Sequence, residues 1–309
     1  LIYGAGGIGG YFGAKLAKAR NEVIIYARGA HLKAIQDKGI YVKSIHGDFN
    51  VKPKLATDDL SKIEQPDLII LGIKSWQIPS TAETLKPLLN KSTMILPLQN
   101  GASNVEKLLK VLPEENVLAG LCFIVSYISA PGEITHAGHE PKIIFGEKDN
   151  SRTQRALDLS EVFKKAEISN LIPEDITLEI WKKFLFITSI SALGGLTRAP
   201  LGKIRESDYL ADVISKTGKE IIEIANAKNI QLNSEHLKSV METIASLDPK
   251  TTASTQRDIM EGKPSELENF NGYIVKEGHR LNVPTPVNQF IYECLLPMEN
   301  QARMQPESK

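Results

Sequence analysis

Glycines near the start of the chain have the spacing of a phosphate-binding turn. The pattern G-x-G-x-x-G lies between a short apolar run, residues 1–3, and a helix-like segment, residues 11–20. The first glycine permits the turn, the second lets a pyrophosphate approach the backbone, and the third lets the helix pack closely on the strand. An anion is then favoured by the unpaired N–H groups and the dipole of the helix N-terminus. The residues that we predict to bind a dinucleotide here are Gly4, Gly6, Gly7, Ile8 and Gly9.

An arginine follows the second expected strand, residues 22–26. In NAD-binding folds an acidic residue at this place binds the ribose 2′-hydroxyl, whereas an arginine pairs with the 2′-phosphate of NADP. This chain has Ala27 and Arg28 there, and no acid. Arg28 is either a 2′-phosphate ligand or a solvated surface arginine, and its position about 20 residues beyond the glycine turn favours the ligand. We therefore expect NADPH (NADP⁺) as the cofactor.

Lys183 interrupts an almost wholly apolar, helix-like segment, residues 178–192, which we expect to be a central buried helix. Apolar surroundings lower the pKa of an isolated ammonium group unless a partner charge is near. When hydride reaches a carbonyl carbon, negative charge develops on the oxygen, and a nearby lysine can stabilise that charge and donate the proton. Lys183 is therefore a candidate general acid, and the alternative is a lysine that extends from a buried helix to the surface.

Ser265 and Glu268 have the S-x-x-E spacing of a capping box, which predicts a helix that starts at Ser265 with Glu268 bonded back to it. Glu266 is then not needed for the cap. Either it interacts with the helix dipole, or its carboxylate meets Lys183 or a substrate hydroxyl at a domain cleft.

Two continuous apolar runs, residues 67–73 and 93–98, predict strands that are covered on both faces, as in a parallel sheet between helices. Ligands bind at the carboxyl ends of such strands. Lys74 follows the first run and Asn100 follows the second, so both are candidates to line a cofactor or substrate crevice. The alternatives are a charged loop and an Asn-Gly turn.

The order of these elements predicts an α/β protein in which an N-terminal Rossmann-type, doubly wound, mainly parallel sheet precedes a C-terminal all-helical domain. We place the domains at 1–172 and 173–309, because strands almost vanish after residues 170–172. Residues 117–129 and 133–145 read as a strand pair that closes the first domain. The polar tail, residues 299–309, is expected to be frayed.

The composition of the chain limits the classes of partner that it can bind. Lys+Arg and Asp+Glu each number 37, so no net field favours nucleic acid or an acidic membrane, and no apolar run is long enough to span a bilayer. Cys122 and Cys294 lack disulfide or metal spacing, which fits a reducing cytoplasm. His136 and His139 have no third ligand nearby, so we interpret them as loop or structural histidines and expect no metal site. A small molecule is the expected partner.

Taken together, the motifs resemble the ketopantoate reductase (2-dehydropantoate 2-reductase) family over nearly the whole chain. They are YGAGGIGGYFGAKLA, YARG, IKSWQ, LQNG, EIWKKF, LTRAPLGKIR and ELENFNGYIV. The resemblance implies NADPH-dependent reduction of 2-dehydropantoate to (R)-pantoate in pantothenate and coenzyme A biosynthesis, and it suggests a cytoplasmic homodimer. It also implies these roles: Arg28 as 2′-phosphate ligand, Lys74 and Asn100 as cleft residues, Lys183 as catalytic lysine, Glu266 as its supporting carboxylate, and Ser254 as a substrate-binding hydroxyl.

The chain departs from the family pattern beside the catalytic lysine. Studied members carry asparagines four and eight residues further on, where this chain has Ile187 and Ser191. Positions i, i+4 and i+8 share one helix face, so these side chains are expected to face the same substrate site as Lys183. Leu201 and Thr251 also stand where asparagines would match. Reduction of a 2-oxo acid is therefore expected, but the acid itself stays open.

The family resemblance and the departures from it are compatible with three functions. The first is a 2-oxo acid reductase of the ketopantoate reductase type. The second is a D-2-hydroxyacid dehydrogenase that uses the same residues on a more apolar, branched 2-oxo acid. The third is a non-catalytic NADP-binding sensor, against which the retention of both Lys183 and Glu266 argues.

Overall fold

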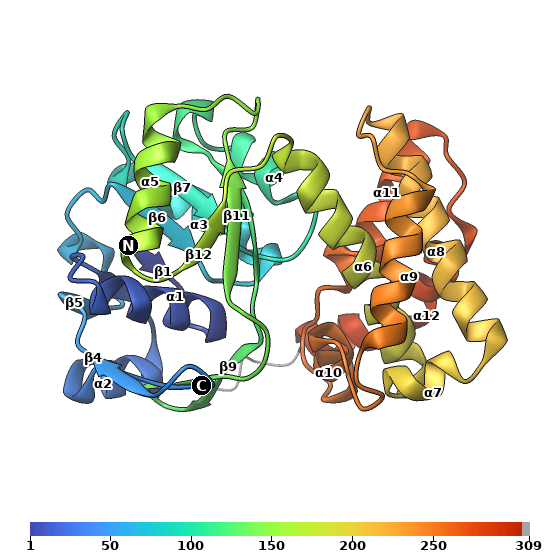
Figure 1. Cartoon of the computed structure of the whole chain (residues 1–309), viewed down its shortest axis with the longest axis horizontal. Coiled ribbons are helices and arrows are strands. Elements are labelled where there is room, and N and C mark those ends of the chain that lie inside the picture. Colours follow the sequence, from blue (N-terminus) through green and yellow to red (C-terminus); the bar gives the residue numbers. More distant parts are fainter. Residues whose placement is uncertain (305–309) are drawn as a thin grey trace. The chain divides into compact units, whose positions relative to one another are not determined.

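The computed structural model describes residues 1–304 (Figure 1). The chain divides into two compact units, which we describe separately. The sheet unit comprises residues 1–100 and 104–176, and the helical unit comprises residues 101–103 and those from 177 onward. The boundary expected from the sequence, after residue 172, lies in the loop that precedes the first helix of the helical unit.

The sheet unit is built on a fully parallel five-stranded sheet, as the continuous apolar runs predict. Its strands have the order β5-β2-β1-β6-β7. The change in winding direction therefore falls between β1 and β6, where such folds bind ligands. The strands are β1 (Ile2–Tyr3), β2 (Ile24–Tyr26), β5 (Leu55–Thr57), β6 (Leu68–Leu71) and β7 (Met94–Pro97).

Helices cover both faces of this sheet. Ile2 and Ile70 pack into a core with α1 and α5, whereas the alternate residues Tyr3 and Leu71 pack into a second core with α3 and α4. Because successive strand residues point to opposite faces, both must be apolar. The helices are α1 (Gly7–Lys18), α2 (Gly29–Lys38), α3 (Ile78–Leu85), α4 (Asn104–Leu109) and α5 (Gln154–Lys165), and four short 3₁₀ turns are η1 (Leu60–Lys62), η2 (Ser75–Gln77), η3 (Lys86–Leu88) and η4 (Glu114–Asn116).

The expected strand pair at residues 117–145 exists, but it is divided between two further sheets. Near the turn, β9 (Ser126–Ala130) and β10 (Glu133–His136) join the hairpin β3 (Ile40–Ser44) and β4 (Phe49–Val51). Away from the turn, β8 (Ala119–Phe123) and β11 (Lys142–Gly146) join β12 (Ser169–Leu171). The half near the turn therefore pairs with β3, and the half away from the turn pairs with β12.

The helical unit contains no strand among its described residues (Figure 1). Its first helix, α6, is the expected buried helix, since none of its residues is exposed. No described helix is both long and apolar enough to cross a membrane. The helices are α6 (Ile176–Thr197), α7 (Leu201–Arg205), α8 (Asp208–Ala227), α9 (Ser234–Ser246), α10 (Ser254–Met260), α11 (Asn271–Leu281) and α12 (Pro286–Met304), and the 3₁₀ turn η5 (Leu267–Asn269) precedes α11.

The expectation of a frayed tail from residue 299 is wrong for its described part. Helix α12 continues to Met304, and both Glu299 and Ala302 are buried. Together with Leu295 they form a buried stripe at helical spacing. A polar residue such as glutamate is expected at the surface, so the sequence pattern did not predict this stripe. Residues 305–309 lie outside the described part of the chain.

Candidate functional site

The glycine turn joins β1 to α1 and is held close to β6. Gly4 has a positive φ of 97°, and a side chain at Gly9 would overlap the carbonyl oxygen of Gly4. A side chain at Gly7 would overlap the backbone of Ser126. The fold itself therefore requires glycine at these three positions, for backbone conformation or for close packing.

Gly6 is different, because neither its conformation nor its packing requires glycine. Its φ of −65° and ψ of −171° are accessible to any residue. A Cβ built on Gly6 would lie 3.6 Å from the carbonyl oxygen of Gly72, at ordinary contact distance, and no other atom lies within 4 Å. The space that this Cβ would fill is left open by the protein, as expected where a pyrophosphate approaches the backbone.

The backbone donors nearest in sequence to this space are those of the glycine turn. Within the described chain, no acceptor is bonded to the N–H groups of Gly6, Gly7 or Ile8 at the start of α1. Free N–H groups at a helix N-terminus are what a phosphate needs. The glycine turn thus fits the diphosphate of a dinucleotide by both space and donors.

His31, which the sequence analysis did not select, fixes the orientation of this turn. Its Nε2 bonds to the carbonyl of Ala5 at 2.9 Å, and its Nδ1 accepts from the N–H of Gly132 at 3.0 Å. Burial lowers the pKa of His31, which favours the neutral ring that can both donate and accept. Because a trans peptide is planar, holding the Ala5 carbonyl toward His31 aims the Gly6 N–H in the opposite direction.

The other predicted residues of the sheet unit lie at the carboxyl ends of its strands. Arg28 is exposed at the start of α2, just after β2, and it forms no ion pair with a described residue. Lys74 follows β6, with its ammonium group 5.5 Å from the ring centre of Trp76. The Ser75 hydroxyl donates to the carbonyl of Asn100 at 2.7 Å, so the loops after β6 and β7 are tied together.

In the helical unit, Lys183, Ile187 and Ser191 follow one another on α6 at intervals of four. Lys183 and Ile187 are half-buried and Ser191 is buried. The neighbouring Phe184 packs edge-to-face on Phe270, with ring centres 6.2 Å apart. This aromatic contact joins α6 to the segment that begins with Glu266, whose carbonyl accepts the N–H of Phe270 at 3.0 Å.

Ser254 begins α10, which packs on the final turns of α6. A side chain at Gly194 would overlap Gln256, and the amide of Gln256 donates to the carbonyl of Ala199 at 2.9 Å. Ser254 itself is exposed. The two glycines of α6, Gly194 and Gly195, therefore allow the close approach of α10.

Leu201 and Thr251 are joined through the backbone, because the Leu201 N–H donates to the Thr251 carbonyl at 3.0 Å. Leu201 is only 4% exposed and belongs to the main core of the helical unit. Its side chain therefore contributes to packing.

The predicted capping box at Ser265 and Glu268 is wrong. Glu268 instead accepts from the Tyr292 hydroxyl and from Lys276, the latter at 2.6 Å. Burial alone would raise the pKa of Glu268, but these two hydrogen bonds and the positive charges of Lys276 and Arg303 together outweigh it and lower the pKa. Ser265 is bonded to Glu299 of α12, so distant partners replace the local cap.

Glu266 lies at the start of the turn η5 and is 7% exposed. Its Oε2 accepts from the side-chain amide of Asn269 at 2.8 Å. The carboxylate is thus nearly buried on the segment that packs against α6, in the same unit as Lys183.

Comparison with known proteins identifies the family of this chain. The family described as "Ketopantoate reductase PanE/ApbA" matches residues 1–150, and "Ketopantoate reductase PanE/ApbA C terminal" matches residues 175–299. The chain belongs to the ketopantoate reductase family. A 2-dehydropantoate 2-reductase of Pyrococcus abyssi (strain GE5 / Orsay) is 30% identical to it over 293 residues, which are 94% of each chain.

Solved structures show the same fold. The crystal structure of a PanE/ApbA family ketopantoate reductase from Ralstonia eutropha JMP134 has a TM-score of 0.89 at 28% identity and covers 98% of each chain. The ternary structure of D-mandelate dehydrogenase with NADH and anilino(oxo)acetate has a TM-score of 0.88 at 21% identity and covers 98% of this chain and 99% of that one. The ketopantoate reductase fold therefore carries more than one substrate specificity.

Members of the ketopantoate reductase family are oxidoreductases that act on a CH–OH group with NADP, and this chain is one of them. The open space at Gly6 and the free N–H groups around it fit that cofactor.

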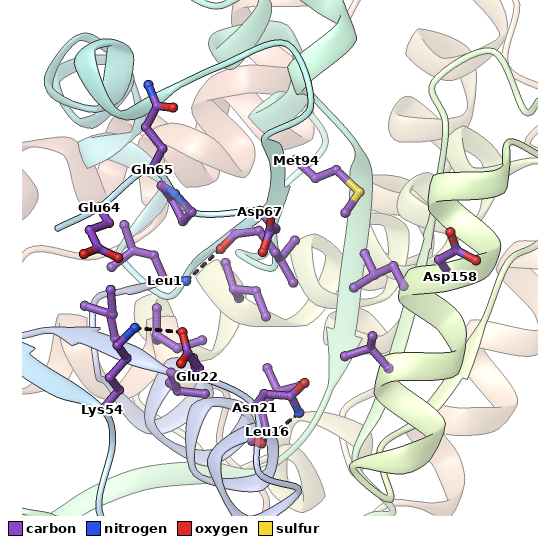
Figure 2. A pocket seen from close by; sticks show the side chains of 18 residues that line it. Leu1, Leu16, Asn21, Glu22, Lys54, Glu64, Gln65, Asp67, Met94 and Asp158 are labelled. Carbon is purple, nitrogen blue, oxygen red and sulfur yellow. Dashed lines mark hydrogen bonds and ion pairs between the residues drawn. The ribbon is translucent and has the colours of Figure 1, made fainter.

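Two other features do not belong to this site. His136 is buried and uses both ring nitrogens, one with the Ser44 hydroxyl and one with the His139 carbonyl, so it is the structural histidine that we expected. A pocket of about 420 Å³ lies at the amino ends of β1, β2, β6 and β7. Lys54 and Glu22, which form an ion pair, are among its lining residues (Figure 2). Ligands of such sheets bind at the opposite, carboxyl edge.

Replacement of Gly6 by alanine tests the assignment of the glycine turn. Gly6→Ala should keep or slightly raise the free energy of unfolding, by about 0.4–1 kcal/mol, because alanine fits the conformation and the space. Its affinity for NADPH should fall about tenfold or more, because the methyl group occupies the diphosphate position. Thermal unfolding and NADPH titration measure the two effects.

Gly9→Ala is the matched control, since its methyl group would strike the backbone of Gly4. This variant should lose stability whether or not NADPH is present. Wild-type NADPH affinity in a well-folded Gly6→Ala protein would contradict the assignment.

Proposed function

We propose that this chain reduces a small 2-oxo acid with NADPH, and that the acid is 2-dehydropantoate, which becomes (R)-pantoate. The observation that carries the proposal is the position of Lys183 on α6, a helix with no exposed residue. The neighbouring Phe184 packs this helix against Phe270, on the segment that begins with Glu266. A carbonyl reduction uses a cation and a supporting carboxylate, which this chain carries on neighbouring segments of one unit, whereas a cofactor-binding sensor requires neither.

In the proposed reaction, bound NADPH supplies hydride to the carbonyl carbon of the 2-oxo acid. The Nζ–H of Lys183 donates a hydrogen bond to the carbonyl oxygen, stabilises its developing negative charge and transfers the proton to it. The product is a 2-hydroxy acid, and Lys183 regains its proton from solvent. Glu266 orients the ammonium group by charge, and the hydroxyl of Ser254 contributes to substrate binding.

Cofactor binding is assigned to residues at the carboxyl edge of the parallel sheet. The N–H groups of Gly6, Gly7 and Ile8 would hold the diphosphate. Arg28 would pair with the 2′-phosphate, which its exposure and its lack of a described ion-pair partner support. Lys74 and Asn100 would line the same crevice, and Asn100 would also face the substrate.

The second candidate function follows from an apolar residue in the proposed substrate site. Ile187 lies one turn beyond Lys183 and has no polar group to offer to a substrate hydroxyl. The replacement of the family's asparagine by Ile187 favours a D-2-hydroxyacid dehydrogenase. Such an enzyme would act on a more apolar, branched 2-oxo acid with the same catalytic residues.

Removal of the Arg28 guanidinium should weaken binding of NADPH and leave NADH unchanged. Losing a charge-assisted pair costs about 1.5–3 kcal/mol, which is roughly a tenfold to hundredfold loss of affinity. Titration of Arg28→Ala with both cofactors measures this, and Lys33→Ala, an exposed cation on the same helix, is the control. Equal affinities of the wild type for NADH and NADPH would exclude the proposed role.

Lys183→Ala should lower kcat by about 10² to 10⁴ while NADPH affinity stays near the wild-type value. The adjacent Lys182 is the matched control, because it pairs with Glu179 at 2.8 Å on the same helix. Lys182→Ala should therefore keep kcat within about twofold of the wild type. The assignment fails if Lys183→Ala turns over at the wild-type rate.

A panel of 2-oxo acids, followed by loss of NADPH absorbance, tests the function and its substrate together. We expect turnover with little discrimination between 2-dehydropantoate and 3,3-dimethyl-2-oxobutanoate, which lacks only the terminal hydroxyl, because Ile187 cannot bond that group. An unpaired hydroxyl costs about 1–3 kcal/mol, so Ile187→Asn should raise the preference for 2-dehydropantoate roughly tenfold or more.

One outcome of the panel would contradict the predicted lack of discrimination at Ile187, and another would contradict the proposed activity. A thousandfold preference of the wild type for 2-dehydropantoate would show that another residue, such as Ser191 or Thr251, binds the hydroxyl. Absence of turnover with every acid, despite NADPH binding, would favour the sensor.

A further inference from the structure

A buried carboxylate in the last turns of α12 holds the residue just before Glu266. Glu299 is 3% exposed, and its two carboxylate oxygens each accept the backbone N–H of Ser265 at 3.1 Å. Its Oε2 also accepts the Ser265 hydroxyl at 2.5 Å. One side chain of α12 therefore satisfies both donors of Ser265, which lies 34 residues earlier in the chain.

Arg303, one turn further along α12, completes this clamp. Its Nη2 lies 2.7 Å from Oε1 of Glu299 and donates to the carbonyl of Ser265 at 3.0 Å. The N–H, the C=O and the hydroxyl of Ser265 are thus all bonded to two residues of one helix. Such charge-assisted hydrogen bonds are stronger and more directional than neutral ones.

The clamp fixes the backbone that carries Glu266. The Ser265 carbonyl belongs to the peptide that joins Ser265 to Glu266, and this peptide is planar, so its orientation is set by Arg303. On the other side, the Leu267 N–H donates to the Ser265 hydroxyl oxygen at 3.2 Å. Hydrogen bonds therefore hold the peptide on each side of Glu266, and the side-chain amide of Asn269 donates to its carboxylate.

A second contact holds the other side of the same segment. Tyr292, two turns before Glu299 on α12, donates its hydroxyl to Glu268. Desolvation and the hydrogen bond to Glu268 raise the pKa of Tyr292, so the phenol remains a donor. Helix α12 therefore holds the residues at both ends of Ser265–Glu268.

We infer that Glu299 and Arg303 are positioning residues for Glu266, which orient its carboxylate toward the reacting site of the helical unit. The inference rests on the proposed role of Glu266. A buried ion pair contributes little to stability that apolar side chains of the same volume could not supply. Its hydrogen bonds, in contrast, set one backbone orientation, and here that backbone belongs to Glu266.

The test is a double-mutant cycle on kcat, with thermal unfolding as the structural readout. Glu299→Gln should lower kcat about tenfold or more, since misplacement of a catalytic group by about 1 Å costs up to 10² in rate, while KM for NADPH stays unchanged. Glu266→Gln should be at least as impaired. In the double variant the losses should not multiply, because Glu299 acts through Glu266.

Glu220→Gln is the matched control. Glu220 is also a buried carboxylate bonded to α12, since it accepts the N–H groups of Val287 and Asn288 at 2.8 and 2.9 Å, and its hydrogen bonds go to α12 rather than to Ser265–Glu268. The Glu220→Gln variant should have a lower melting temperature than the wild type, while its kcat stays within about twofold of the wild-type value. If Glu299→Gln does not fold, Arg303→Gln, whose side chain is 30% exposed, replaces it in the cycle.

The outcomes separate the inference from the function on which it rests. Wild-type kcat in Glu266→Gln would overturn the role of Glu266 and the inference with it. An impaired Glu266→Gln beside a fully active Glu299→Gln or Arg303→Gln would overturn the inference alone. Losses that multiply in the double variant, or a kcat loss in Glu220→Gln as large as that in Glu299→Gln, would show that the clamp only stabilises the fold.

Discussion

The close approach of α1 to the carboxyl ends of β1 and β6 is the constraint on which the cofactor half of the structure depends. At Gly9 and Gly72 the backbones lie so near to the Gly4 carbonyl that no side chain fits between them. This contact brings the N-terminus of α1 to the point where the winding of the sheet changes direction. His31 then fixes the orientation of the turn, and the space beside Gly6 remains open.

In the helical unit, Lys183 lies half-buried on the apolar helix α6, and Glu266 lies nearly buried on a segment that packs against this helix. Aromatic contacts of Trp181 and Phe184 with Tyr273 and Phe270 join α6 to the segment that carries Glu266. Polar contacts with α12 then orient that segment. Packing thus sets the distance between these elements, and hydrogen bonds set the orientation of the backbone that carries Glu266.

Local patterns in the sequence predicted most of the fold. The strand, glycine turn and helix at the N-terminus, the parallel strands and the buried helix α6 each follow from spacing within about 20 residues. Features that depend on distant partners were missed or wrong. The S-x-x-E pattern at Ser265 predicted a local cap, but Glu299, 34 residues away, provides the stronger partner. His31 bonds to Gly132, 101 residues away, and no local pattern marks that contact. The candidate residues Lys183, Ser254 and Glu266 were selected by type and by family resemblance, and their roles remain proposals.

Transfer of label from the cofactor tests the central claim most directly. The wild-type protein is incubated with 2-dehydropantoate and NADPH deuterated at both C4 positions, and the product is analysed by mass spectrometry and NMR. The account predicts pantoate with one deuterium at C2, formed as NADPH is consumed. Unlabelled product, or NADPH that is bound but not consumed with any 2-oxo acid, would contradict the claim that this chain is a hydride-transferring 2-oxo acid reductase.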